Sequence, residues 1–124
     1  MHTDRPTLAL DDVVYVIVPR LNRAQKLVNQ TLDTLIRDAA SSAELAKRLE
    51  QRRCFTLELQ AINTNLEHLL ARHRADVQTL LQSGGSKGGR HVALDPMETD
   101  AVERAKEIYR KVVAFQTGRR EVPF

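Results

Sequence analysis

Apolar residues recur every three or four positions along most of this chain, a spacing that places them on one face of an α-helix. In the first part of the chain this stripe runs without a change of phase through Val14, Ile17, Leu21, Ala24, Val28, Leu32, Leu35 and Ala39. Asp11 or Asp12 stands before the stripe, where a carboxylate caps the free N–H groups of a helix start. The pattern predicts a flexible arm over residues 1–10 and a first helix over residues 11–40.

Pro19 interrupts the stripe, because proline lacks a backbone N–H and its ring crowds the preceding helical turn. Two interpretations remain open. The first helix continues with a kink at Pro19, which the unchanged phase of the stripe favours. Alternatively, the run of β-branched residues and tyrosine over residues 13–18 forms a short extended segment before a helix that begins near Pro19.

A second helix is indicated by Ser41, which can cap a helix start, together with Glu44 three residues later. No proline or glycine follows as far as Gln82, so the pattern predicts one helix over residues 42–82, about 60 Å long. Its apolar seam repeats every seven residues or a multiple of seven, with Leu45, Leu49, Leu59, Leu66, Leu70, Val77 and Leu80. The alternative is a break at residues 63–65, because Asn and Thr are weaker helix formers.

A glycine-rich loop over residues 83–94 separates the second helix from a third. Residues 95–98 supply a capping aspartate, a proline at the first helical position and a glutamate in the first turn. A third helix is therefore predicted over residues 95–117. A short tail over residues 118–124 follows, after the glycine that ends this helix.

Together these segments predict an all-α fold in a single domain covering residues 1–124. We expect a three-helix antiparallel bundle with a long central helix, because the short connection between the first two helices makes them antiparallel. The composition agrees with this class, since 42% of the residues are apolar and 28% are charged. Aromatic residues are only 4% of the chain, so Leu, Val and Ala must supply the core.

Charge and cysteine content favour a cytoplasmic protein that does not cross a membrane. The net charge is +3, a mild excess compared with that of most dedicated nucleic-acid-binding domains. Cys54 is the only cysteine and cannot form an internal disulfide. The most apolar run, residues 13–18, is far shorter than the ~20 residues of a spanning helix, and no signal-peptide pattern opens the chain.

The chemical motifs in the sequence are weak. The loop Gly-Gly-Ser-Lys-Gly-Gly-Arg lacks the spacing of a phosphate-binding loop and follows a helix instead of a strand. His68 and His73 are five residues apart, so on a helix they point in different directions and do not form a zinc pair. Cys54 is expected to be a small core residue. We therefore predict no enzymatic activity, no cofactor and no metal site.

The length of the predicted second helix points to protein binding. A ~60 Å helix is longer than the third helix can cover, and exposing its terminal leucines to water would be costly. We expect a non-enzymatic interaction module, adaptor-like or chaperone-like, that pairs as a coiled-coil-like homodimer or binds another protein. The candidate interface residues are Leu45, Leu49, Phe55, Leu59, Ile62, Leu66, Leu70 and Val77.

The alternative function is a small nucleic-acid-associated regulator, because basic residues recur along the second helix and the glycine-rich loop. The candidate contacts are Arg52, Arg53, Arg72, Arg74, Lys87 and Arg90. Acidic residues alternate with them, and Glu44–Arg48 and Glu50–Arg53 have helical pairing distances. A self-neutralised solvated face is therefore the simpler interpretation.

Overall fold

The computed structural model describes residues 6–85 and 90–116, and these residues form an all-α fold with a small two-stranded ribbon. In chain order the elements are β1 (Thr7–Ala9), α1 (Leu10–Asp12), η1 (Val13–Ile17), α2 (Val18–Arg37), α3 (Ser42–Arg72), α4 (Arg74–Gln82), β2 (His91–Ala93) and α5 (Pro96–Gln116). The predicted tail over residues 118–124 lies outside the described residues.

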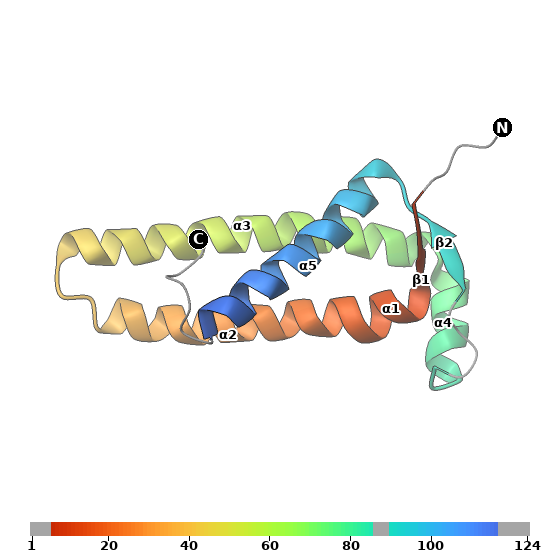
Figure 1. The fold of residues 1–124 in the computed structure, drawn as a ribbon, viewed down its shortest axis with the longest axis horizontal. Helices are drawn as coiled ribbons and strands as arrows, with labels where there is room; N and C mark the ends of the chain where they lie inside the picture. The colour runs from red at the N-terminus through yellow and green to blue at the C-terminus, as the bar shows by residue number, and fades with distance from the viewer. Residues whose placement is uncertain (1–5, 86–89, 117–124) are drawn as a thin grey trace.

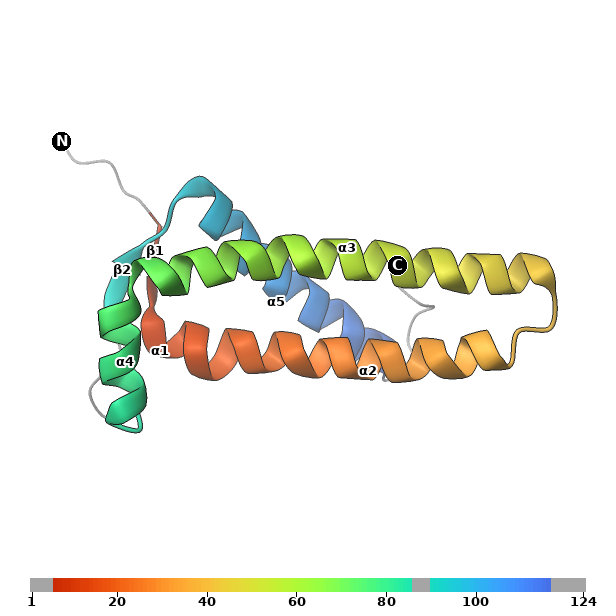
Figure 2. The same ribbon diagram turned by 180° about the vertical axis from the view of Figure 1, so that it is seen from behind.

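Two long antiparallel helices, α2 and α3, form a hairpin, and α5 packs against both of them (Figure 1). The third helix was predicted to lie antiparallel in a three-helix bundle. Instead, α5 runs diagonally over one face of the hairpin, and the opposite face is seen from behind in Figure 2. The closed end of the hairpin projects beyond α5, whereas α4 and the β-ribbon lie at the other end.

The first helical segment is continuous from residue 10 to residue 37, because α1, η1 and α2 follow one another without a gap. The alternative of an extended segment before Pro19 is therefore wrong. The irregularity is a π-helical turn, η1, in which the Val18 N–H donates to the Val13 carbonyl five residues earlier. This wider turn lies where Pro19 cannot donate to Tyr15 and where its ring would crowd that carbonyl.

The predicted cap of this helix is also wrong. The helix begins at Leu10, before Asp11 and Asp12, which instead occupy its first turn. The Leu10 N–H donates to the carbonyl of Arg90 at 3.0 Å, so a backbone group from the distant loop replaces a side-chain cap.

The cap of α3 is confirmed. The Ser41 hydroxyl accepts from the Glu44 N–H at 3.1 Å, and the Glu44 carboxylate accepts from the Ala40 N–H at 3.0 Å. The two side chains thus satisfy backbone donors at the start of the helix and fix the tight connection that makes the hairpin.

The single helix predicted over residues 42–82 is wrong, because the chain turns at His73 and continues as the separate helix α4. His73 has φ −115° and ψ 32°, outside the helical range. The alternative break at residues 63–65 is wrong too, since these residues lie within α3. The turn lets α4 fold over the end of the hairpin and bury Leu80 completely.

Glycines end α4, as the loop composition predicted. Gly84 and Gly85 have φ of 63° and 91°, which side-chain-bearing residues rarely adopt. Their N–H groups donate to Leu81 at 3.2 Å and Leu80 at 3.0 Å, so the last helical carbonyls are satisfied.

Two short strands replace part of the predicted arm and part of the predicted loop. β1 pairs antiparallel with β2, with Leu8 opposite Val92. The Leu94 N–H donates to the Pro6 carbonyl at 2.9 Å and continues the ribbon beyond the strands. Strands of three residues are too short to leave a recognisable alternation in a sequence.

The core lies between α2, α3 and α5, and the ribbon and α4 close it at one end. Its buried members include Leu10, Leu21, Leu32, Phe55, Ile62, Leu66, Leu69, Leu80, Ile108 and Val112. Within the described part of the chain, no helix has both the length and the apolar character needed to cross a membrane.

Candidate functional site

The residues predicted to form an interface divide into three groups. Four are buried inside the monomer, namely Phe55, Leu59, Ile62 and Leu66. Leu70 and Val77 are half-buried and pack against the same core. Only Leu45 and Leu49 are exposed, with 37% and 48% of their surface accessible to solvent. The middle of the predicted seam therefore binds α2 and α5 of the same molecule, and its accessible part lies in the first turns of α3.

A third leucine extends this accessible part. Leu57 is 50% exposed, and it lies eight residues after Leu49 and twelve after Leu45. Residues spaced by four along a helix form one ridge on its surface, so the three leucines share a row that is interrupted by Arg53. We call Leu45, Leu49 and Leu57 the outer leucine row. Leu57 lies off the seven-residue seam, so the repeat of the sequence does not indicate it.

Charges of both signs flank the outer leucine row. The Arg53 guanidinium donates to Glu50 at 2.7 and 2.9 Å, and Arg48 lies 3.9 Å from Glu44. Hydrogen bonding to Arg53 lowers the pKa of the Glu50 carboxyl below its ordinary value, more than the opposing effect of desolvation raises it. The predicted pairs within α3 are confirmed. This surface therefore combines apolar side chains with balanced charge.

Cys54 lies beside this surface and is exposed, so the expectation that it is a core residue is wrong. Its Sγ lies 3.6 Å from the Glu50 carboxylate. A nucleophilic cysteine is normally activated by a basic or cationic group, whereas this hydrogen-bond partner is acidic. The geometry supplies no catalytic role for Cys54.

The candidate nucleic-acid contacts are mostly paired with acidic groups. Arg52 pairs with Asp33, Arg53 with Glu50, Arg72 with Glu98, and Arg90 with Asp76. Arg74 is exposed on α4 without an ion pair to any described residue, and Lys87 lies outside the described residues. These pairs are spread over the hairpin and the end carrying α4, so they do not gather into one basic surface.

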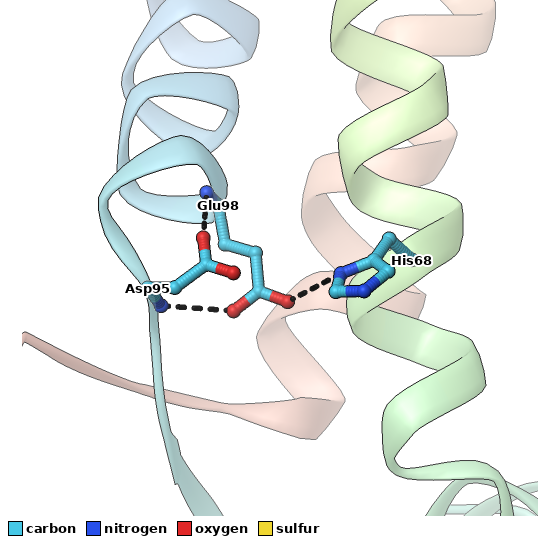
Figure 3. A group of neighbouring side chains, drawn as sticks. All are labelled: His68, Asp95 and Glu98. Atoms are coloured by element: carbon cyan, nitrogen blue, oxygen red, sulfur yellow. Dashed lines mark hydrogen bonds and ion pairs between the residues drawn. The ribbon is translucent and has the colours of Figure 1, made fainter.

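A buried carboxylate joins α5 to α3. Glu98 is fully buried in the first turn of α5, and its side chain points toward His68 on α3 (Figure 3). The Asp95 N–H donates to Oε1 at 2.9 Å, while the Glu98 N–H donates to the Asp95 carboxylate at 2.7 Å. Arg72 donates to both Glu98 oxygens, and His68 Nδ1 lies 3.3 Å from Oε2. The predicted cap at Asp95 is confirmed, and Glu98 adds a tertiary contact to it.

Burial raises the pKa of the Glu98 carboxyl. Hydrogen bonds from the Asp95 N–H and the Arg72 guanidinium lower this pKa by more than burial raises it, so the pKa lies below its ordinary value. A carboxylate that is buried with a cation and a backbone donor stays charged. Glu98 is therefore an ionised group that fixes α5 against α3.

His68, Asp95 and Glu98 also bring ligand atoms within 4.8 Å of one another, a spacing that could suit a metal ion. However, both Glu98 oxygens already accept hydrogen bonds from Arg72. A cation at this point would lie against the guanidinium and would have to displace it. The donor set fits a structural ion pair better than a metal centre.

No family model, no curated protein and no solved structure matches this chain.

Proposed function

We propose that this protein is a non-enzymatic helical interaction module that forms a homodimer through the outer leucine row of α3. The observation that carries the proposal is the exposure of Leu45, Leu49 and Leu57, which is 37%, 48% and 50%, in one row on a single helix. α4 buries Leu80 at the opposite end of the hairpin. The outer leucine row of α3 stays exposed among the described residues, and a second surface could bury it.

A second copy of the chain suits this row for reasons of geometry. The two ends of the row are twelve positions apart on α3, about 18 Å. A ridge of residues spaced by four packs into the matching groove of another helix. A two-fold axis near the middle of the row would pack the row of one copy against the same row of the other copy. Glu50 and Arg53 supply charges of both signs beside the row. Because these leucines are only partly exposed, burying the rest of each side chain contributes about 1 kcal/mol.

Size-exclusion chromatography with light scattering, at protein concentrations from about 5 to about 200 µM, tests this proposal. We expect the wild-type protein to have twice the monomer mass of 14.0 kDa at high concentration. The double variant Leu49→Glu/Leu57→Glu should remain monomeric. The matched control is Leu81→Glu on α4, which alters a leucine that is equally exposed but lies outside the row.

A wild-type protein that is monomeric over the whole range would overturn the homodimer. Equal dissociation of the double variant and of Leu81→Glu would show that another surface makes the contact. Tight binding of a DNA duplex that falls steeply with salt would favour the alternative of a nucleic-acid regulator. A cytoplasmic location forms part of the same proposal, because Cys54 is unpaired within the chain.

A further inference from the structure

A groove lies between the start of the first helical segment and α5, away from the outer leucine row. It contains two adjoining cavities of about 400 and about 360 Å³. Val16, Arg20 and Tyr109 line both cavities, so they form one continuous depression that α5 borders on one side and η1 and α2 border on the other.

The larger cavity of the groove has a mainly apolar lining, and the smaller one is more polar. Ile17 and Ala105 are buried in the larger cavity, and Val16 is half-buried beside them. Val113 on α5 and Tyr15 on η1 are large apolar side chains that remain exposed at its two ends. An apolar depression with exposed large side chains is typical of a surface that receives a partner.

Four cations surround this lining, namely Arg20, Arg23, Lys106 and Arg110. Arg110 lies 3.1 Å from Glu107, and Lys106 lies 4.0 Å from Glu103. Arg20 and Arg23 have no carboxylate partner among residues 6–85 and 90–116. The Arg20 guanidinium instead lies 5.1 Å from the centre of the Tyr109 ring, across the groove. The groove therefore has a local excess of positive charge.

We propose that this groove binds an acidic amphipathic helix of a partner protein. The apolar side of the partner helix would cover Val16, Ala105 and Val113. The Asp and Glu residues of that helix would pair with Arg20 and Arg23. The walls are helices whose backbone groups already form hydrogen bonds within each helix. A helical ligand, which satisfies its own backbone groups, fits such walls better than an extended peptide.

The groove is separate from the surface proposed for the homodimer. The groove is built from η1, α2 and α5, whereas the outer leucine row lies on α3. The double variant Leu49→Glu/Leu57→Glu should therefore bind an acidic amphipathic peptide as tightly as the wild-type protein does. Failure of the homodimer would thus leave binding in the groove unchanged.

A displayed library of random peptides of about 16 residues, selected on the full-length protein, provides the test. We expect the recovered peptides to have apolar residues at helical spacing, flanked by Asp and Glu, and to become helical when bound. Fluorescence anisotropy with the recovered peptides should show at least about fivefold weaker binding to Arg20→Glu and to Arg23→Glu. Raising the salt from about 50 to about 300 mM should weaken binding as well.

Arg74→Glu is the matched control, because Arg74 is an exposed cation on α4 with no ion pair among the described residues. It should bind the peptides as tightly as the wild-type protein does. Circular dichroism checks that each variant is folded. Val113→Gln tests the apolar lining without changing the charge of the groove.

The proposal is overturned if the library yields no binder, or if the recovered peptides lack acidic residues. It is also overturned if they bind the double variant Arg20→Glu/Arg23→Glu as they bind the wild-type protein. A DNA duplex that binds more tightly than the peptides, and that loses affinity in the same variants, would assign the groove to nucleic acid instead.

Discussion

Arg72 on α3 donates hydrogen bonds to both carboxylate oxygens of Glu98 on α5, to Oε1 at 2.6 Å and to Oε2 at 3.1 Å. The Arg72 guanidinium also donates to the Ala93 carbonyl at 3.1 Å, just before α5 begins. One side chain thus holds both the end of the β-ribbon and the start of α5. This contact joins residues 26 positions apart and ties the first turn of α5 to α3.

Glu98→Gln should lower the free energy of unfolding by about 2–3 kcal/mol, because the amide cannot offset the charge of Arg72. The loss is smaller than for a fully buried pair, since 42% of the Arg72 side chain is exposed and remains hydrated. Urea unfolding followed by circular dichroism measures the change. The control is Glu103→Gln on the surface of α5, which should cost less than about 0.5 kcal/mol. Equal losses in the two variants would contradict the role given to Glu98.

Stability should fall as the solution is acidified through the titration of Glu98. The pKa of Glu98 is lowered in the folded protein from its ordinary value of 4.5, so the folded state holds its proton less tightly than the unfolded chain. Its contribution is complete above the unfolded pKa and is lost as the pH falls through the folded pKa. Urea unfolding between about pH 6 and about pH 3 measures this slope.

Asp95 and His68 also contact Glu98, so the wild-type pH dependence includes more than one group. The difference between the wild-type protein and Glu98→Gln gives the contribution of the Glu98 carboxyl. The variant should show a flatter loss of stability over the same range. An identical slope in the wild-type protein and the variant would contradict the assignment.

Leu80→Ala and Leu81→Ala should differ sharply, although the two residues are adjacent on α4. Leu80 is fully buried where α4 folds over the hairpin, whereas Leu81 is 55% exposed. We expect Leu80→Ala to cost about 2–5 kcal/mol through lost burial and a cavity. Leu81→Ala should cost less than about 0.5 kcal/mol. Thermal or urea unfolding compares them, and similar costs would mean that α4 does not pack on the core as described.

The apolar seam of the second predicted helix shows why only part of the candidate site could be predicted. A period of seven residues selects both core and interface leucines, because both require burial. Leu59 and Leu66 are buried in the described structure, while Leu45 and Leu49 are exposed. The groove beside α5 was missed for a related reason: Arg20 and Tyr109 are far apart in sequence, and neither belongs to a local motif.

The sequence by itself determined most of the helical residues and the starts of α3 and α5. The stripe of α2, the Ser41–Glu44 cap and the Asp95 cap depend on residues three or four positions apart, whose geometry is set as soon as a helix forms. Only the tertiary structure decided the turn at His73, the pairing of Leu8 with Val92 and the burial of Glu98. These features depend on packing and hydrogen bonds between distant segments, whose energies do not appear in any local pattern of residues.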